Sequence, residues 1–469
     1  MGKEKAIVPP VAMGDPVTLQ VERLGYRGEG VARYRGFTIF VEGALPGETV
    51  EAQITQVKRS FAIAELRAIV HPTSERVVPL CPVFDVCGGC QLQHLSYAAQ
   101  LQFKRQVVKD ALVRIGKFAA EDVQRWVQPV IGQEEPWRYR NKVSLTATAR
   151  AGRFVAGFVE EGTHEPVEST TCLIRPHAYD ELLQIIITQF EQHGVRAYDE
   201  QSQSGDVRQL IVRSNHKHEV MIVILTGMHE LVHGRELAAA WAKQMPQGYR
   251  LVSVIQQKRN DGKNGVRKRD ASEEVLYGDA SIQEQIDGLT FRISASAFLQ
   301  VNPIQTRILY EKALNAAAIS SQDVVFDFYC GVGTLSLLAG RQAKAVYGVE
   351  SVSAAVEDAK FNARQNGLTN AHFYAGFVEQ VAPQLLSSEV HPNVILLDPP
   401  RAGCGPEVIT ALLQASPQRI VYISCNPATL ARDLRQLVDG GYALQSVEPI
   451  DMFPQTAHVE VISSIVLKK

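Results

Sequence analysis

The sequence predicts a multidomain α/β protein, and three observations support this prediction. The chain has 469 residues, which is too long for one ordinary domain. Residues 13–70 alternate short apolar runs with glycine-containing turns, as small antiparallel barrels do. From about residue 291 the pattern changes to strand, glycine loop, helix and strand, which is typical of a doubly wound parallel sheet. We therefore expect three domains, at residues 12–70, 71–290 and 291–469.

The first predicted domain is an OB-like β-barrel. Its strand-like runs include VTLQVERL, FTIFVEG and FAIAELRAIV, and glycine turns such as GYRGEG join them. Barrels of this kind often bind oligonucleotides, although the fold alone does not establish binding. Lys58, Arg59 and Phe61, which we expect beside the turn at Gly25–Gly30, suit contact with a nucleic-acid backbone.

The predicted middle domain is of the α+β type. The runs LIVRS, EVMIVIL and RLVSVIQQ predict strands, and a helix is expected around Tyr179–His193. A second helix is expected at residues 96–116, with Val108 and Leu112 on its apolar face and Lys104 off that face. Two placements stay open for this helix, one within the middle domain and one on the C-terminal domain.

The composition is that of an ordinary folded protein. Hydrophobic residues make up 45% and charged residues 21% of the chain, and the net charge is −2. There is no apolar run of about 18 residues, so we expect no membrane segment. The start, MGKEKAIVPP, lacks the apolar core of a secretion signal, so the cytoplasm is the expected compartment. Nothing in the sequence indicates an obligate protein partner.

Basic residues are nevertheless concentrated in two places. Residues 101–150 hold ten Lys or Arg against five Asp or Glu, a local net charge of +5. The run Trp137–Lys142 mixes cationic and aromatic side chains, which suits single-stranded nucleic acid. The alternative for either patch is a solvated face. The second patch consists of Lys258, Arg259, Lys263, Arg267, Lys268 and Arg269.

A cofactor loop is predicted at the first strand of the C-terminal domain. Asp327 lies at the end of that strand, Gly331 and Gly333 follow in the loop, and Glu350 closes the next strand, where a carboxylate can accept hydrogen bonds from ribose hydroxyls. The loop lacks the third glycine of a dinucleotide site and the Gly-Lys-Ser/Thr of a P-loop. Its Asp-x-x-x-Gly-x-Gly-Thr pattern resembles the first motif of S-adenosylmethionine methyltransferases.

Three further residues supply reactive groups near the same sheet edge. Asp398 precedes two prolines that fix its backbone, Cys425 follows the next strand, and Glu460 begins the last one. A thiolate that adds to carbon 6 of uracil makes carbon 5 nucleophilic, and a base must later remove the carbon-5 proton. A thiolate, a base and a sulfonium donor together therefore suit methylation of uracil carbon 5.

These motifs resemble those of the RNA 5-methyluridine methyltransferase family. The matching segments are DFYCGVGT, DPPRAG, SCNPATLARD, the terminal TAHVE and SAFLQVN at 296–302. The resemblance implies a Rossmann-like S-adenosylmethionine methyltransferase domain, with Cys425 as nucleophile and Glu460 as base. It also implies that the donor site is lined by Gln300, Tyr329, Glu350 and Asp398.

A cysteine cluster lies outside this domain. Cys81, Cys87 and Cys90 fall within ten residues, and Cys172 is the natural fourth ligand. Four thiolates could hold a zinc ion or an iron–sulfur cluster. The resemblance to the ribosomal-RNA branch of the family implies a [4Fe–4S] cluster, with zinc as the alternative.

The resemblance also implies the substrate. The barrel resembles the TRAM domain of RNA-modifying enzymes, and the transfer-RNA branch lacks both this barrel and the cysteine cluster. Both features therefore favour a uridine of large-subunit (23S) ribosomal RNA over one of tRNA. The rival enzyme is an exocyclic-amine methyltransferase built on Asp398-Pro399-Pro400, in which Arg401 stands where an aromatic is typical. A third reading is a non-catalytic iron–sulfur RNA-binding protein.

Overall fold

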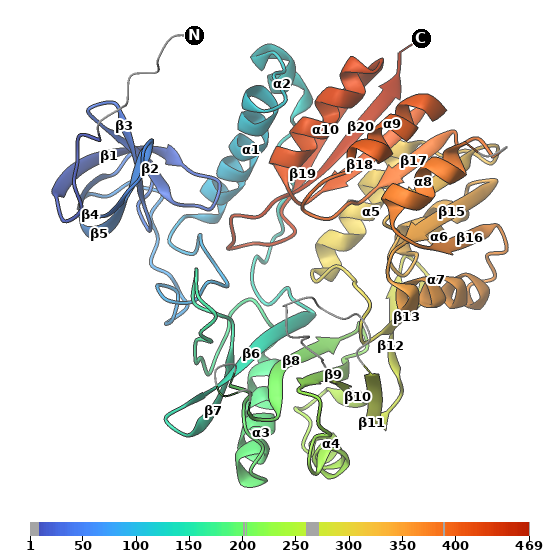
Figure 1. The fold of residues 1–469 in the computed structure, drawn as a ribbon, viewed down its shortest axis with the longest axis horizontal. Helices are drawn as coiled ribbons and strands as arrows, with labels where there is room; N and C mark the ends of the chain where they lie inside the picture. The colour runs from blue at the N-terminus through green and yellow to red at the C-terminus, as the bar shows by residue number, and fades with distance from the viewer. Residues whose placement is uncertain (1–8, 200–201, 203, 259–271, 388–389, 469) are drawn as a thin grey trace.

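The computed structural model describes residues 9–199, 202, 204–258, 272–387 and 390–468, and most of the second basic patch lies outside these ranges. Figure 1 shows three bodies: a small barrel, a mixed sheet with helices below it, and a large sheet flanked by helices. The predicted fold classes are confirmed. Within the described ranges, no helix is long and apolar enough to cross a membrane.

The N-terminal barrel is closed, in the strand order β1-β2-β3-β5-β4. Alternate residues of its first strand, Val17, Leu19 and Val21, point into the barrel core because side chains alternate along a strand. The barrel strands are β1 (Pro16–Leu24), β2 (Gly30–Tyr34), β3 (Phe37–Val41), β4 (Thr49–Val57) and β5 (Phe61–His71).

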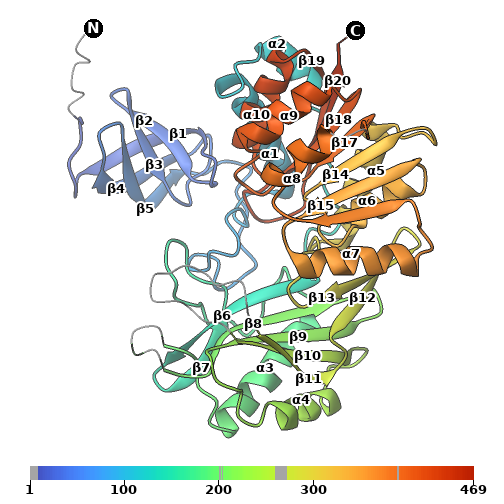
Figure 2. The same cartoon turned by 45° about the vertical axis from the view of Figure 1, so that its right-hand side comes forward.

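The middle part is a six-stranded sheet in the order β11-β10-β9-β8-β6-β7. Two helices cover one of its faces (Figure 2), and their Phe190 and Trp241 rings meet edge to face in the core. The expected helix at 179–193 and the three expected strands are present. The elements are β6 (Lys142–Arg150), β7 (Arg153–Gly157), α3 (His177–Gln192), β8 (Val207–Ser214), β9 (Glu219–Thr226), α4 (Gly234–Lys243), β10 (Arg250–Lys258) and β11 (Ser272–Gly278).

The C-terminal sheet has seven strands in the order β16-β15-β14-β17-β18-β20-β19. The five strands from β16 to β18 in this order are parallel to one another, as predicted. Strand β20, in contrast, runs antiparallel to both β18 and β19. The elements are α5 (Pro303–Ala317), β14 (Val324–Phe328), α6 (Thr334–Gly340), β15 (Ala345–Glu350), α7 (Ser353–Gln365), β16 (Ala371–Ala375), α8 (Val378–Leu386), β17 (Val394–Leu397), α9 (Pro406–Ala415), β18 (Arg419–Ser424), α10 (Pro427–Asp439), β19 (Tyr442–Ile450) and β20 (Glu460–Leu467).

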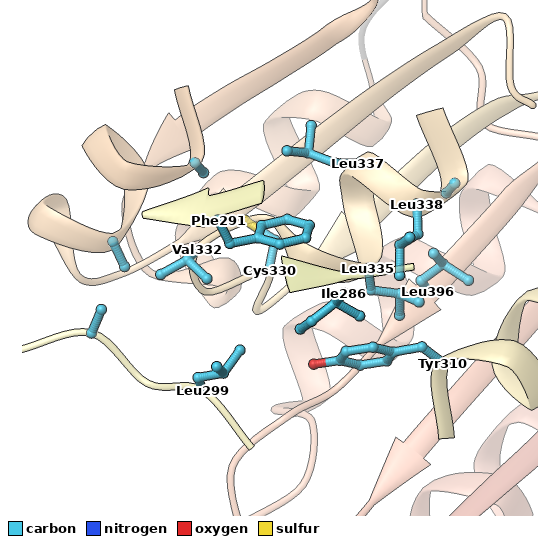
Figure 3. Packing of buried hydrophobic residues seen from close by; sticks show 14 of the residues in the cluster. Ile286, Phe291, Leu299, Tyr310, Cys330, Val332, Leu335, Leu337, Leu338 and Leu396 are labelled. Carbon is cyan, nitrogen blue, oxygen red and sulfur yellow. The ribbon is translucent and has the colours of Figure 1, made fainter. Parts of the chain in front are cut away.

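A hairpin of β12 (Ser281–Ile286) and β13 (Leu289–Ser294) belongs with this sheet. Figure 3 shows its Ile286 and Phe291 among the buried side chains of the C-terminal core, near Leu335 and Cys330. The predicted domain boundary at residue 290 falls inside β13. We therefore propose that the C-terminal domain begins before β12.

Helices α1 (Tyr97–Arg114) and α2 (Ala120–Trp126) lie against α10 and β19, which both views show (Figures 1 and 2). Val108 and Leu112 join the hydrophobic core of the C-terminal sheet. The predicted helix is therefore present, in the second of the two placements. One detail of the prediction is wrong: Lys104 is completely buried on the packed face, where it pairs with Asp451, also buried.

Candidate active site

The predicted cofactor loop is built at the carboxyl edge of β14. Gly331 and Gly333 have φ angles of +54° and +81°, which glycine adopts without strain. A Cβ at Gly333 would meet Phe373 at 3.0 Å and Ala359 at 3.1 Å, so this position has no room for a side chain. The loop can therefore bring its backbone close to a ligand.

Glu350 is fixed at the end of β15 by three donors. The Gly331 N–H lies 3.2 Å from Oε2, and the Val352 N–H and Ser351 hydroxyl lie 2.7 and 3.1 Å from Oε1. Asp327, in contrast, is buried and accepts a hydrogen bond from Ser336, and burial raises its pKa to about 7. Glu350 is thus rigidly oriented at the loop, whereas Asp327 holds the loop's helix in place.

A pocket with about 410 Å³ of empty space opens between this loop and β17. Tyr329 and Asp398 line it together with Gly331, while Gln300 lies in a neighbouring cleft that shares Leu299 with the pocket. Tyr329, Glu350 and Asp398 therefore lie around the glycine loop, and the fourth predicted donor-site residue, Gln300, lies in the adjoining cleft. Tyr329 is further fixed by its hydroxyl, which donates to Glu379 Oε1 at 2.9 Å.

Cys425 and Glu460 are brought together by strand register. The last pair between β18 and β20 is Ser424 with Val461, and Cys425 and Glu460 are the residues that adjoin this pair. The two side chains are close enough for the Glu460 charge to act on the Cys425 thiol. Cys425 is partly exposed and Glu460 is buried.

The charges at this edge are strongly coupled. Burial, the Glu460 carboxylate and the Asp398 carboxylate raise the pKa of Cys425 to about 11, and Arg401 acts in the opposite direction. Burial and Asp398 likewise raise the pKa of Glu460 well above its ordinary value. Its Oε2 has no hydrogen-bond partner among the described residues. Such an oxygen is available to a proton-bearing ligand.

The segment 451–459, which leads into Glu460, is anchored from the first third of the chain. The Tyr139 hydroxyl donates to the Pro454 carbonyl at 3.1 Å, and the Gln91 and Leu92 amides donate to the Gln455 carbonyl at 3.0 Å each. Lys104 reaches the Phe453 carbonyl at 3.0 Å. These anchors went unrecognised in the sequence, although Lys104 precedes the buried residues Val108 and Leu112 by four and eight positions.

This arrangement corrects part of the RNA-binding prediction. Tyr139 is buried, and Lys104 is buried in an ion pair with Asp451, so neither side chain can contact RNA. Arg138 donates to the Cys172 and Arg175 carbonyls at 2.7 and 3.0 Å. The +5 balance of residues 101–150 therefore includes cations that hold the protein together.

The four cysteines of the predicted cluster line one pocket. Cys81, Cys87, Cys90 and Cys172 surround it from the loop before α1 and from the segment after β7. Burial raises the pKa of Cys81, Cys87 and Cys90, that of Cys90 to about 12, and the Cys172 charge adds to the rise at each. Within the described ranges, no three His, Cys, Asp or Glu side chains converge closely enough to hold a single metal ion.

Comparison with known proteins identifies the family. The tRNA (uracil-5-)-methyltransferase family pattern matches residues 230–469, and the TRAM domain matches residues 11–66. A protein described as an RNA methyltransferase from Halalkalibacterium halodurans is 41% identical over 469 residues, 100% of both chains. A second one, from Clostridium tetani, is 41% identical and covers 97% of this chain and 96% of its own. The chain belongs to the uracil-5-methyltransferase family.

The RNA uracil-5-methyltransferase described here therefore carries a TRAM barrel at its N-terminus, as the sequence predicted. A solved structure of the Pyrococcus abyssi tRNA (uracil-54, C5)-methyltransferase with S-adenosyl-L-homocysteine has a TM-score of 0.75 and 26% identity to this methyltransferase. The alignment covers 96% of this chain and 99% of the other. Because the stretch from β1 to β5, residues 16–71, is more than a tenth of the chain, an alignment that covers 96% of the chain includes most of the barrel.

Proposed function

We propose that this enzyme methylates carbon 5 of a uridine in RNA, with S-adenosylmethionine as the methyl donor and Cys425 as a covalent nucleophile. The observation that carries this proposal is the proximity of Cys425, Glu460 and Asp398 at one end of β17, β18 and β20, next to the pocket of the glycine loop. The SAH-bound relative supports the donor, since its alignment spans nearly all of this chain.

Each group then has one role. The Cys425 sulfur adds to carbon 6 of the uracil, and the electrons of the C5–C6 double bond become an enolate. Carbon 5 takes the methyl group of bound S-adenosylmethionine, whose sulfur–methyl bond breaks and leaves S-adenosylhomocysteine. Glu460 removes the proton from carbon 5, and the C5–C6 double bond re-forms as the bond between sulfur and carbon 6 breaks. Arg401 favours the thiolate form of Cys425 by its positive charge.

The donor site is proposed to consist of Gln300, Tyr329, Glu350 and Asp398. The fixed carboxylate of Glu350 suits ribose hydroxyls, which are donors. Asp398 and Tyr329 line the pocket beside the reacting pair. The position of Gln300 in the adjoining cleft suits the outer end of the donor.

For the substrate, we retain large-subunit ribosomal RNA as the first candidate and add tRNA as the second. The barrel and cysteine segment were the reasons to prefer ribosomal RNA. The Pyrococcus abyssi enzyme acts on a tRNA uridine and aligns over 96% of this chain, so the barrel does not separate the two substrate classes. Transcripts of both classes, offered in parallel with labelled S-adenosylmethionine, distinguish them.

We also propose that Cys81, Cys87, Cys90 and Cys172 hold a [4Fe–4S] cluster, with zinc as the alternative. A zinc ion needs its four sulfurs about 2.3 Å from one point, whereas a cluster needs them spread around a pocket. Four thiols that line one pocket supply a ligand set that either group could use, and the family resemblance favours the cluster. Anaerobic purification should give iron and sulfide with visible absorption. Zinc at one equivalent without sulfide would contradict the cluster.

The covalent mechanism is tested with RNA that contains 5-fluorouridine. Fluorine cannot leave as a proton, so the adduct should persist on a denaturing gel, with the RNA bound to the Cys425 peptide in mass spectra. Methylation of normal RNA without any such adduct would contradict the covalent mechanism. The exocyclic-amine alternative predicts that Cys425→Ala keeps its activity, whereas our proposal predicts complete loss.

A further inference from the structure

The TRAM barrel reaches the catalytic centre through its β1–β2 turn, residues 25–29. Gly28 has a φ of +94°, and a Cβ there would lie 3.0 Å from Leu92 and 3.7 Å from Ala457. The turn is therefore seated directly on the segment that leads into Glu460. At its tip, the Tyr26 hydroxyl lies 3.4 Å from Asn426 Oδ1, next to Cys425.

Tyr26 stands in the electrostatic field of the reacting groups. Burial raises its pKa, Arg401 lowers it, and Cys425 and Glu460 raise it. Even so, 47% of the residue is exposed. It lines a pocket with about 710 Å³ of empty space, whose other walls include Gln91, Ala457 and His458. Tyr26 thus lines this pocket while its hydroxyl lies beside Asn426, the residue next to Cys425.

The weak link between Tyr26 and Asn426 indicates that the ring matters more than the hydroxyl. The Asn426 side chain already donates to the Arg401 carbonyl at 2.9 Å. It also accepts from the Ala428 amide at 3.1 Å and so caps the N-terminus of α10. The 3.4 Å contact from Tyr26 is the longest of the three. Asn426 is therefore held without it.

A half-exposed aromatic ring beside the nucleophile suits a nucleobase. A uridine inside folded RNA must leave its stack before a thiolate can reach carbon 6, and unstacked bases pair their faces with aromatic side chains. We propose that the barrel supplies Tyr26 to the active site, where its ring stacks on an unstacked RNA base and so helps to hold the target uridine at Cys425. This proposal rests on the proposed function and adds a substrate-binding residue to it.

Kinetics of Tyr26 variants test the proposal, with an accepted transcript or, failing that, with binding of a fluorescent (U)12 RNA. Tyr26→Ala should raise the KM or Kd for RNA about tenfold, because one stacked base is worth that much. Tyr26→Phe and Tyr26→Trp, which keep a ring, should stay within about twofold to threefold. The KM for S-adenosylmethionine should not change.

Tyr34→Ala, a tyrosine of the same barrel outside this pocket's lining, is the matched control. Its RNA KM should stay near that of the wild type. An equal rise in Tyr34→Ala would reduce Tyr26 to a barrel-stability residue. An effect of Tyr26→Phe as large as that of Tyr26→Ala would assign the role to the hydroxyl and overturn the stacking proposal, as would an unchanged Tyr26→Ala. Thermal midpoints of all variants report folding.

Failure of this proposal differs from failure of the proposed function. If wild-type enzyme forms no Cys425 adduct, the covalent mechanism is wrong, while the RNA affinities of the Tyr26 variants still decide the stacking role. If the adduct forms and Tyr26→Ala binds RNA normally, only the stacking role is wrong.

Discussion

The two residues of the proposed reacting pair, Cys425 and Glu460, are held in place in different ways. Cys425 follows β18 directly, and Asn426 and Pro427 start α10 at once, so the nucleophile is placed by three consecutive residues. Glu460 comes after the nine-residue segment 451–459, whose backbone and side chains are tied to the distant residues Lys104, Gln100 and Tyr139. The proposed nucleophile is thus placed mainly by β18 and α10, whereas the segment before the proposed base is held by residues from the first third of the chain.

This difference teaches where sensitivity to mutation should lie. Substitutions far from the site that loosen the 451–459 segment should impair proton removal and stability more than adduct formation. Substitutions near Cys425 should affect the adduct first. The following predictions test this division, from the largest expected effect to the smallest.

After Cys425→Ala, Glu460→Gln should cost the most activity. Without a base, turnover should fall about 10²- to 10⁴-fold, while attack by Cys425 continues, so the RNA adduct should accumulate with normal uridine. Gel shift under denaturing conditions and methyl-transfer rates measure both effects. Loss of the adduct together with turnover would contradict the assignment of separate roles to the two residues.

The same variant has a stability signature. Burial and Asp398 raise the pKa of Glu460 in the folded chain, so ionising it destabilises the fold as the pH rises above the ordinary carboxyl range. Glu460→Gln removes this penalty, so its thermal midpoint should exceed that of the wild type by a margin that grows as the pH rises from the ordinary carboxyl pKa to the raised pKa of the folded chain and then levels off. Asp398 should not be substituted in this variant, because its carboxylate contributes to the raised pKa of Glu460 that the experiment tests.

Lys104→Met should destabilise the fold by about 3–5 kcal/mol, since it strands the buried Asp451 carboxylate. Denaturant unfolding measures the loss, and the double variant Lys104→Met/Asp451→Leu should recover much of it. Lys109→Met, on the same helix, is the control and should change stability by less than about 1 kcal/mol. Equal costs at 104 and 109 would refute the anchoring role.

Arg401→Gln should slow adduct formation about tenfold at neutral pH. The Arg401 charge lowers the pKa of Cys425, so its removal raises that pKa and moves the rising limb of the adduct rate to higher pH. Rates with 5-fluorouridine RNA across a pH series check the shift. Arg401→Lys keeps the charge and should retain most of the wild-type profile; a lysine variant as slow as the glutamine one would point to RNA contact instead.

Arg27→Ala should have the smallest effect. Arg27 pairs with Glu161 on an exposed surface, and such pairs contribute less than about 1 kcal/mol. Unfolding experiments should find little change, and the Glu460-dependent step should be unaffected. A cost as large as that of Lys104→Met would show that exposed contacts also anchor the barrel turn.

The sequence predicted the parts whose signals are local. Strand and helix periodicity predicted the barrel, the mixed sheet and the parallel strands, and the glycine loop and the residues after β17 and β18 predicted the proposed site, whose residues the structure gathers at one sheet edge. It did not predict that β20 is antiparallel to its neighbours, because hydrophobic periodicity carries no information on strand direction. It also missed Tyr26 and the Lys104–Asp451 pair, because these contacts join positions hundreds of residues apart.

The pairing of Lys104 with Asp451 has a consequence for biosynthesis. The two residues are 347 positions apart, so α1 leaves the ribosome long before the chain that covers it. Until β19 and α10 are made, Val108 and Leu112 face water or a chaperone. The packing of α1 therefore cannot be completed until Asp451 has been synthesised, 347 residues after Lys104.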